Sequence, residues 1–220
     1  YSQRLNLLLA VADKEFRSDN VPKSIMNRSS AVKGMLKTEW EGAGEVQDVS
    51  QYSTLLGSIK PNPFVRRHYP NIASTHRYKK AQIFIKAMWG ACLEAEQIIK
   101  EITPHIYKRQ TELFEDVKKE WRFGTMYTSS ISNFNISAPF HRDTGNIIGT
   151  VNTILTKRNN ANGGCLNVPD YDVTFEQADN SMLVYPAWKN VHGVTPIKQI
   201  SEDGYRNSLI FYPLKAFKGI

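Results

Sequence analysis

With 220 residues, the chain is long enough for one compact domain, or for one domain with a helical extension. Its 41% of hydrophobic residues can fill a sizeable core, which excludes intrinsic disorder, and no apolar run approaches the roughly 20 residues that a membrane span needs. The net charge of +7 comes from 28 basic and 21 acidic residues, and it is unevenly distributed along the chain.

Residues 1–122 predict a mainly helical half of the protein. Leu5–Phe16 has the pattern of a short amphipathic helix, and Ser30–Trp40 predicts a second one. Glycines at positions 42 and 44 and the polar stretch to Ser53 are typical of a loop.

Residues 57–80 predict a basic connection. Three prolines make its first part, residues 57–75, irregular and extended. The connection carries six basic residues and no acidic one, so it is either a phosphate-binding surface or a solvated basic loop. The basic residues are Lys60, Arg66, Arg67, Arg77, Lys79 and Lys80, and His68, Tyr69 and His76 lie between them.

Two consecutive helices follow this connection. Apolar residues repeat at steps of three and four over residues 76–102, which predicts an amphipathic helix. Thr103 then offers an N-cap side chain, and Pro104 suits the first position of a second helix whose apolar face extends to Trp121. We expect the two helices to pack together and to present one shared apolar face.

From Phe123 onward the pattern changes to period two, which is typical of strands. Four strands are expected, separated by turn signals rich in Asn, Asp and Gly. They are Met126–Phe134, Gly149–Thr156, Ser181–Tyr185 and Arg206–Tyr212. The sequence therefore predicts an α+β protein, with an antiparallel sandwich or barrel over 123–220 and the helical half 1–122 packed against it in one continuous domain.

A metal site is indicated by His141, Asp143 and His192. Residues two apart in an extended segment project to the same side, so His141 and Asp143 can reach one metal ion. With His192 they would form a face of two imidazoles and one carboxylate, which leaves positions open for a chelating co-substrate and O₂, as a non-haem Fe(II) oxygenase needs. A His-x-Asp pair also occurs as a purely structural pair.

An anion site is indicated by Arg206 and Ser208. They lie two residues apart on an expected strand and together form a fork for a carboxylate. An arginine in the middle of an apolar strand needs an anion to compensate its burial. The alternative is an internal salt bridge to Asp143, Asp170 or Asp172.

The order His-x-Asp, distal His, then Arg resembles the Fe(II)- and 2-oxoglutarate-dependent dioxygenases, whose core is a double-stranded β-helix. Within that superfamily, residues 141–146 (HRDTGN) are similar to the HRDxxN form of TET proteins, and residues 206–212 (RNSLIFY) to the TET-like form RxSLxFY. The TET/JBP group oxidises the 5-methyl group of pyrimidines in nucleic acid and includes phage-encoded enzymes of about this size. The resemblance covers residues 123–215 and does not extend to residues 1–75.

The resemblance implies a jelly-roll, cupin-like double-stranded β-helix with the helical half packed against it. It implies Fe(II) bound by His141, Asp143 and His192, with O₂ as co-substrate. It also implies that Arg206, assisted by Ser208, binds the distal carboxylate of 2-oxoglutarate.

The resemblance also implies roles for residues that would bind the substrate or the keto-acid. Asn146 would hydrogen-bond the flipped pyrimidine, or else be a turn residue after the metal strand. Arg142 would hold either the keto-acid or a structural partner. A methyl group inside a duplex cannot reach the metal, so the base must leave the stack, and Tyr185, Trp188 and Tyr212 are candidates to contact it, unless they serve the core.

DNA is the partner that this resemblance implies. The phosphate contacts are expected first from the basic connection, with Lys60, Arg66, Arg67, Arg77, Lys79 and Lys80, and second from Lys157 and Arg158. His68 and Tyr69 could approach the base or fill the gap that it leaves.

The implied activity is oxidation of 5-methylcytosine in DNA to 5-hydroxymethylcytosine. The alternatives are a thymine hydroxylase of the JBP type, a 2-oxoglutarate-dependent prolyl or small-molecule hydroxylase, and a non-catalytic cupin-like binding module. A basic connection on the same face as the metal favours DNA, and one on the opposite face favours a smaller substrate.

The two cysteines, Cys92 and Cys165, have no metal-ligand spacing, and their number excludes a disulfide framework. We therefore expect free thiols in an intracellular, reducing compartment, the bacterial host cytoplasm if the chain is phage-encoded. No membrane partner is expected, and the sequence is compatible with a monomer without fixing the oligomeric state.

Overall fold

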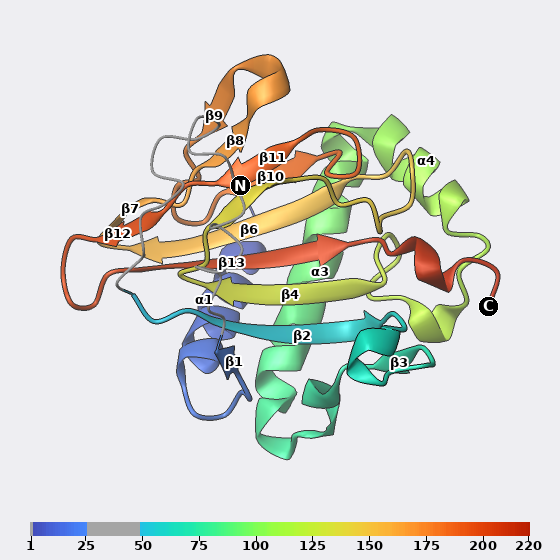
Figure 1. Ribbon diagram of the computed structural model, residues 1–220, viewed down its shortest axis with the longest axis horizontal. Coiled ribbons are helices and arrows are strands. Elements are labelled where there is room, and N and C mark those ends of the chain that lie inside the picture. Colours follow the sequence, from blue (N-terminus) through green and yellow to red (C-terminus); the bar gives the residue numbers. More distant parts are fainter. Residues whose placement is uncertain (1, 26–48) are drawn as a thin grey trace.

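The computed structural model describes residues 2–25 and 49–220, and its elements carry the labels of Figure 1. The helix expected over 30–40 lies outside the described residues, as do the glycines at 42 and 44. Within the described residues, no helix combines the length and the apolarity that crossing a membrane requires. The α-helices are α1 (Gln3–Arg17), α3 (Gln82–Ile102) and α4 (Pro104–Leu113), and the strands are β1 (Ser24–Ile25), β2 (Tyr52–Ile59), β3 (Asn71–Ile72), β4 (Ser129–Phe134), β5 (Ala138–His141), β6 (Asn152–Asn159), β7 (Ala161–Gly163), β8 (Leu166–Val168), β9 (Val173–Phe175), β10 (Met182–Tyr185), β11 (His192–Val194), β12 (Ile197–Gln199) and β13 (Tyr205–Tyr212).

The strands form antiparallel sheets. The major sheet has the order β1-β2-β4-β13-β6-β10, and β3 adds to β2. A minor sheet has the order β5-β11-β8-β9, and β12 pairs with β7. Figure 1 shows β2, β4, β13 and β6 side by side, with α1 and α3 behind them. The protein is thus a mixed helical and antiparallel-sheet fold in which one face of the major sheet is covered by helices.

Strand β13 divides its side chains between the two faces of the major sheet, because successive residues of a strand point in opposite directions. Leu209 and Phe211 belong to the hydrophobic core shared with α1 and α3. Arg206 and Ser208 instead line a cavity on the opposite face. The alternation therefore separates a structural face from a face that carries the polar groups of interest.

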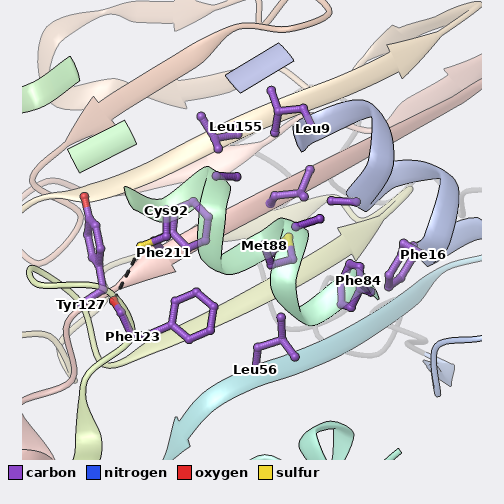
Figure 2. Packing of buried hydrophobic residues seen from close by; sticks show 14 of the residues in the cluster. Leu9, Phe16, Leu56, Phe84, Met88, Cys92, Phe123, Tyr127, Leu155 and Phe211 are labelled. Carbon is purple, nitrogen blue, oxygen red and sulfur yellow. Dashed lines mark hydrogen bonds between the residues drawn. The ribbon is translucent and has the colours of Figure 1, made fainter. Parts of the chain in front are cut away.

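Aromatic and aliphatic side chains fill the core between the helices and the sheet (Figure 2). Phe84 and Met88 of α3 are fully buried, as is Leu56 of β2. Phe123 and Phe211 stack with ring centroids 6.0 Å apart. Burial of each such side chain contributes about 1.5–3 kcal/mol, so this layer fixes the position of β13.

A buried carboxylate fastens α1 to the same strand. Asp13 is 2% exposed, and its two oxygens accept hydrogen bonds from the Tyr205 hydroxyl at 2.7 Å and from the Asn207 side-chain amide at 3.1 Å. The Arg17 guanidinium, 3.0 Å away, balances the charge. Asp13 therefore holds both sequence neighbours of Arg206.

Several expected boundaries are confirmed and others are wrong. The first helix lies where the sequence predicts it. The long helix begins only at Gln82, because Tyr78 is extended and residues 74–81 form short 3₁₀ turns. The second helix ends at Leu113, after which Phe114 and Val117 enter a separate small core.

The expectation that residues 52–59 belong to a loop and an irregular connection is also wrong, because they form β2 within the major sheet. Residues on both faces of β2 are buried, so the strand lacks the period-two signal. Gly57 has a φ of 71°, and a Cβ atom there would lie 2.7 Å from the backbone oxygen of Thr128. A glycine inside the strand further weakened its signal.

Candidate metal centre and anion site

His141, Asp143 and His192 come together at one point. Each offers a ligand atom, and these atoms all lie within 4.8 Å of one another. His141 of β5 is the cross-strand partner of His192 of β11, and their ring centroids are 4.4 Å apart. The Asp143 Oδ1 atom lies 3.4 Å from the His141 Nε2 atom. Register in the minor sheet therefore assembles the two-imidazole, one-carboxylate set that the sequence predicts.

Backbone carbonyls orient both imidazoles. The His141 Nδ1–H group donates to the Pro139 carbonyl at 2.7 Å, and the His192 Nδ1–H group donates to the Asn190 carbonyl at 3.0 Å. A carbonyl oxygen can only accept, so each Nδ1 carries a proton, and in the neutral ring Nε2 is the nitrogen that can bind a metal ion. Burial lowers the pKa of His192, which favours the neutral form that binds metals.

Two asparagines orient the carboxylate. The Asn152 side-chain amide donates to Asp143 Oδ2 at 2.8 Å, and the Asn146 side-chain amide donates to Asn152 Oδ1 at 2.8 Å. Burial alone raises the pKa of the Asp143 carboxyl, but the hydrogen bond and charge of His141, the charge of His192 and the Asn152 hydrogen bond outweigh burial and lower it. The carboxylate is therefore ionised, as ligation of a divalent cation requires.

A cavity of about 400 Å³ contains this cluster and lies between the two sheets. The major sheet contributes residues from β4, β6, β10 and β13, and the minor sheet contributes residues from β5, β8 and β11. Arg206, Ser208, Asn146, Tyr185 and Tyr212 line the same cavity. The expected metal, anion and most of the expected substrate residues thus share one space.

Arg206 is a buried cation without an acidic partner. It is 1% exposed, and its guanidinium donates to Ser208 Oγ at 3.4 Å and to Gln177 Oε1 at 2.5 Å. Its Nε–H group has no hydrogen-bond partner in the part of the chain that the structure describes. Within the described residues no carboxylate lies within salt-bridge distance, so the alternative pairing with Asp143, Asp170 or Asp172 is wrong.

The electrostatics of this end of the cavity favour an anion. Burial, followed by the nearby charge of Arg158, lowers the pKa of Arg206 to about 10. The guanidinium is still charged at neutral pH, and a buried charge is costly unless it is paired. A carboxylate that enters the cavity would supply the missing charge and accept the free N–H group.

Of the three aromatic residues expected to contact the base, two line the cavity. Tyr185 packs edge-on against His192, with ring centroids 5.1 Å apart. Tyr212 is half-buried and lines the cavity with the metal cluster, and its pKa is raised, first by burial and then by the charge of Asp143. Trp188 does not line the cavity; its indole N–H donates to the Thr150 carbonyl at 2.9 Å. Trp188 is therefore not among the residues that line the cavity, and its contact with a base stays a prediction.

Asn146 is a turn residue whose side chain also lines the cavity. Its backbone N–H group donates to the Asp143 carbonyl at 2.9 Å, as in a turn after the metal strand, and its side chain lines the cavity. Arg142 is exposed and lines the cavity as well. Asn152 and Gln177 were missed in the sequence, because only their contacts with Asp143 and Arg206 mark them.

The basic residues fall into two groups. Lys60 lines the cavity, while Arg66, Arg77, Lys79 and Lys80 are exposed and Arg67 is half-buried. Lys157 and Arg158 instead have internal partners: Lys157 binds Asp179 at 2.8 Å, and Arg158 donates to the Gln177 and Ala161 carbonyls. Of these residues, Lys60 is therefore the cation at the cavity, while Lys157 and Arg158 are already bound to other groups.

Comparison with known proteins gives a structural likeness. No family model matches the chain, and no curated protein matches it. The solved structure of NgTET1 in complex with 5mC DNA is similar over 99% of this chain and 93% of that chain, with a TM-score of 0.59 and 13% identity. An oxidoreductase of the 2OG-Fe(II) oxygenase family from Burkholderia pseudomallei matches over 93% and 77%, with a TM-score of 0.48 and 14% identity. At such identity, the first comparison shows a shared fold.

Proposed function

We propose that the protein is an Fe(II)- and 2-oxoglutarate-dependent dioxygenase that oxidises the 5-methyl group of a pyrimidine base in DNA, with 5-methylcytosine converted to 5-hydroxymethylcytosine. The two antiparallel sheets around the cavity would then be the two sides of a double-stranded β-helix. The observation that carries the proposal is the buried Arg206, which has no acidic partner among residues 2–25 and 49–220, in the cavity that also holds the His141, Asp143 and His192 cluster.

The donor set fits the ion. Two imidazole nitrogens and one carboxylate are the ligands of non-haem ferrous oxygenases, and they leave positions open for a co-substrate. A bound ferrous ion supplies the oxidising chemistry: one oxygen atom of O₂ enters the methyl group as a hydroxyl, and the other enters succinate as 2-oxoglutarate loses CO₂. The protein itself supplies binding, orientation and exclusion of water.

The chain's own residues have distinct tasks in this proposal. Arg206 and Ser208 bind the distal carboxylate of 2-oxoglutarate, while Gln177 holds the guanidinium in place. Asn152 orients the Asp143 carboxylate. Tyr185 packs against the ring of His192, which limits the rotation of that imidazole and narrows the cavity.

DNA is supported as the substrate by charge and by likeness. Lys60, the first cation of the basic connection, lines the cavity, where its charge would attract the phosphate backbone of an entering nucleotide. The protein of similar fold, NgTET1, was solved with 5mC DNA. Asn146 and Tyr212 line the cavity and offer an amide and a phenol to a base edge.

The experiment that tests the proposal is an incubation with Fe(II), 2-oxoglutarate and DNA that contains either 5-methylcytosine or only thymine as a 5-methylpyrimidine. Nucleosides are identified by mass spectrometry and succinate is measured in parallel. We expect 5-hydroxymethylcytosine with one succinate per hydroxyl formed. Hydroxymethyluracil instead would identify the thymine alternative, and succinate without any modified nucleoside would favour a prolyl or small-molecule substrate.

A further inference from the structure

Large apolar side chains are exposed to solvent in the segment that follows Lys60, a residue of the cavity. Phe64 is 100% exposed, Val65 is 62% exposed and Tyr69 is 80% exposed. Other exposed apolar residues, such as Leu7 on α1 and Ile102 on α3, lie elsewhere in the chain. A group of exposed apolar residues within six positions points to an interaction partner.

Backbone hydrogen bonds hold Phe64 at the tip of a closed turn. The Asn62 N–H group donates to the Arg67 carbonyl at 2.7 Å, and the Arg67 N–H group donates back to the Asn62 carbonyl at 3.1 Å. The Arg67 Nε–H group also donates to the Lys60 carbonyl at 2.7 Å. Arg66 has a left-handed φ of 56°, a conformation that a non-glycine residue keeps only where its surroundings impose it. Phe64 is therefore presented in a defined position.

The base of this turn lies beside the candidate metal centre. Lys60 is the last residue before the prolines, and its side chain lines the cavity. A Cβ atom placed on Gly145, two residues after Asp143, would be 3.6 Å from Lys60 Nζ. Figure 1 shows the segment between β2 and β3 projecting from the end of β2. Phe64 is thus four residues from a side chain that shares the cavity with the metal ligands.

Charge identifies the class of partner. Residues 57–80 contain no acidic side chain, and Arg66 and Arg67 directly follow the exposed Phe64–Val65 pair. An apolar tip with flanking cations suits a DNA duplex, because the cations bind phosphates while an apolar side chain enters the base stack. An anionic membrane would present similar chemistry, but a membrane does not explain why the turn adjoins the cavity.

We infer that Phe64 is a wedge that enters the duplex and occupies the space left when the target base moves into the cavity. The inference rests on the proposed function. Extrusion of a base breaks its stacking with both neighbours, and an aromatic ring in the gap replaces part of that stacking. The Asn62–Arg67 turn fixes the backbone that carries the ring, so little backbone order is lost when the ring inserts. Phe64 then positions the substrate and does not contact the reacting atoms.

The test compares duplex with single-stranded DNA in the wild type and in Phe64→Ala. We expect the ratio of duplex to single-strand kcat/KM to fall about tenfold in the variant, because stacking on an aromatic side chain is lost. A duplex with an abasic site opposite the target should restore the ratio, since extrusion there breaks no base pair. Phe64→Trp should keep the wild-type ratio.

A second measurement needs no turnover. A 2-aminopurine placed next to the target base becomes more fluorescent when its neighbour leaves the stack. We expect the wild type to raise this fluorescence on binding and Phe64→Ala to raise it less, without 2-oxoglutarate present. Leu7→Ala, an exposed apolar residue on α1, is the matched control and should behave as the wild type does.

The outcomes separate the wedge from the proposed activity. A wild type that raises the fluorescence through Phe64 but oxidises no DNA would contradict the activity and retain the wedge. A wild type that oxidises duplex DNA with an unchanged ratio in Phe64→Ala would overturn the wedge and retain the activity. Loss of the effect in Tyr69→Ala instead of Phe64→Ala would overturn the assignment to Phe64. Loss of binding to vesicles of phosphatidylserine in Phe64→Ala, with an unchanged DNA ratio, would identify a membrane contact instead.

Discussion

The Asn152 side-chain amide donates a hydrogen bond to Asp143 Oδ2 at 2.8 Å, which leaves Oδ1 of the same carboxylate 3.4 Å from His141 Nε2. One carboxylate oxygen is thus held by the major sheet while the other faces the imidazoles of the minor sheet. Asn152 therefore joins the two sheets at the point where a metal ion would bind.

Replacement of Asn152 by alanine should weaken metal binding about 10- to 100-fold, because partners that orient a metal-binding carboxylate typically contribute that much. Titration of the protein with Co(II), followed by visible absorption, measures the change. Asn167→Ala, which removes an amide bonded to Thr174 on the minor sheet, is the matched control. Equal affinities for the two variants would show that Asp143 needs no support from Asn152.

His141→Ala and Asp143→Ala should each abolish Fe(II) binding and succinate formation, because two remaining ligands do not hold a divalent ion in a cavity open to water. His105→Ala, an exposed histidine on α4, should leave both unchanged. Binding is followed by Co(II) absorption and turnover by succinate release. Undiminished turnover in either cluster variant would remove the proposed triad.

Arg206→Gln should raise the 2-oxoglutarate requirement about 10- to 150-fold, the equivalent of the roughly 1.5–3 kcal/mol that a hydrogen bond to a charged group contributes. The wild type should also gain about 2.7 kcal/mol of unfolding free energy at a 2-oxoglutarate concentration 100 times its Kd, and the variant should not. Arg122→Gln, which removes a guanidinium bonded to backbone carbonyls outside the cavity, controls for loss of a partly buried arginine. An unchanged requirement in Arg206→Gln would place the anchor elsewhere.

Reversal of charge at Arg66 and Arg67 should weaken DNA binding and flatten its dependence on salt, because fewer counterions are released from the DNA. Fluorescence anisotropy at several salt concentrations gives the slope. The double variant Lys14→Glu/Lys86→Glu has the same change in net charge on exposed helix positions, and its slope should stay closer to that of the wild type. Equal slopes for the two double variants would indicate a general charge effect.

His76 should make stability depend on pH. The Gly57 N–H group donates to His76 Nε2 at 2.9 Å, so the folded protein needs the neutral ring, and burial lowers the pKa of His76 below its usual value of 6.5. The unfolded chain therefore binds a proton that the folded protein resists, and stability falls as the pH drops from about 6.5 toward the lowered pKa. The unfolding free energy of the wild type, measured with urea, should therefore fall between pH 7.5 and pH 5.5, values chosen to span about one pH unit on each side of 6.5.

His76→Gln keeps an acceptor at this position and removes the titration. Its loss of unfolding free energy over the same interval should be smaller than that of the wild type. His192, whose pKa is also lowered by burial, titrates in both proteins and cancels in the comparison. Identical losses would show that His76 does not resist protonation in the folded protein.

The residues that would bind the metal ion and the anion were easier to predict from the sequence than the strand pairing that brings them together. The pairs 141/143 and 206/208 follow from the two-residue period of a strand, and the structure places both pairs in one cavity. His141 and His192 are 51 positions apart in the sequence (192 − 141) and are paired across two strands. Their pairing depends on the register of a sheet whose strands are three or four residues long. Such short strands carry too few residues for a periodic signal.

Other expected site residues do not line the cavity, because they make contacts that the sequence does not reveal. Trp188 was expected at the substrate because of its size and position, but its indole N–H group finds a backbone carbonyl outside the cavity. Lys157 and Arg158 were expected to contact DNA phosphates, but Asp179 and the Gln177 carbonyl, about twenty positions away in the sequence, bind them in the structure. Asn152 and Gln177 gave no signal, since an amide acquires its role only from the group that it touches.

The hydrogen bonds of Asp13 imply that the β-rich half of the chain is not self-sufficient. A fragment that starts at residue 123 would lack the carboxylate that secures Tyr205 and Asn207, and it would also lack the β2 neighbour of β4. A shortened version of this protein should therefore retain its first helix. The position of the Arg206 guanidinium depends on Asp13, which lies nearly two hundred positions earlier in the chain.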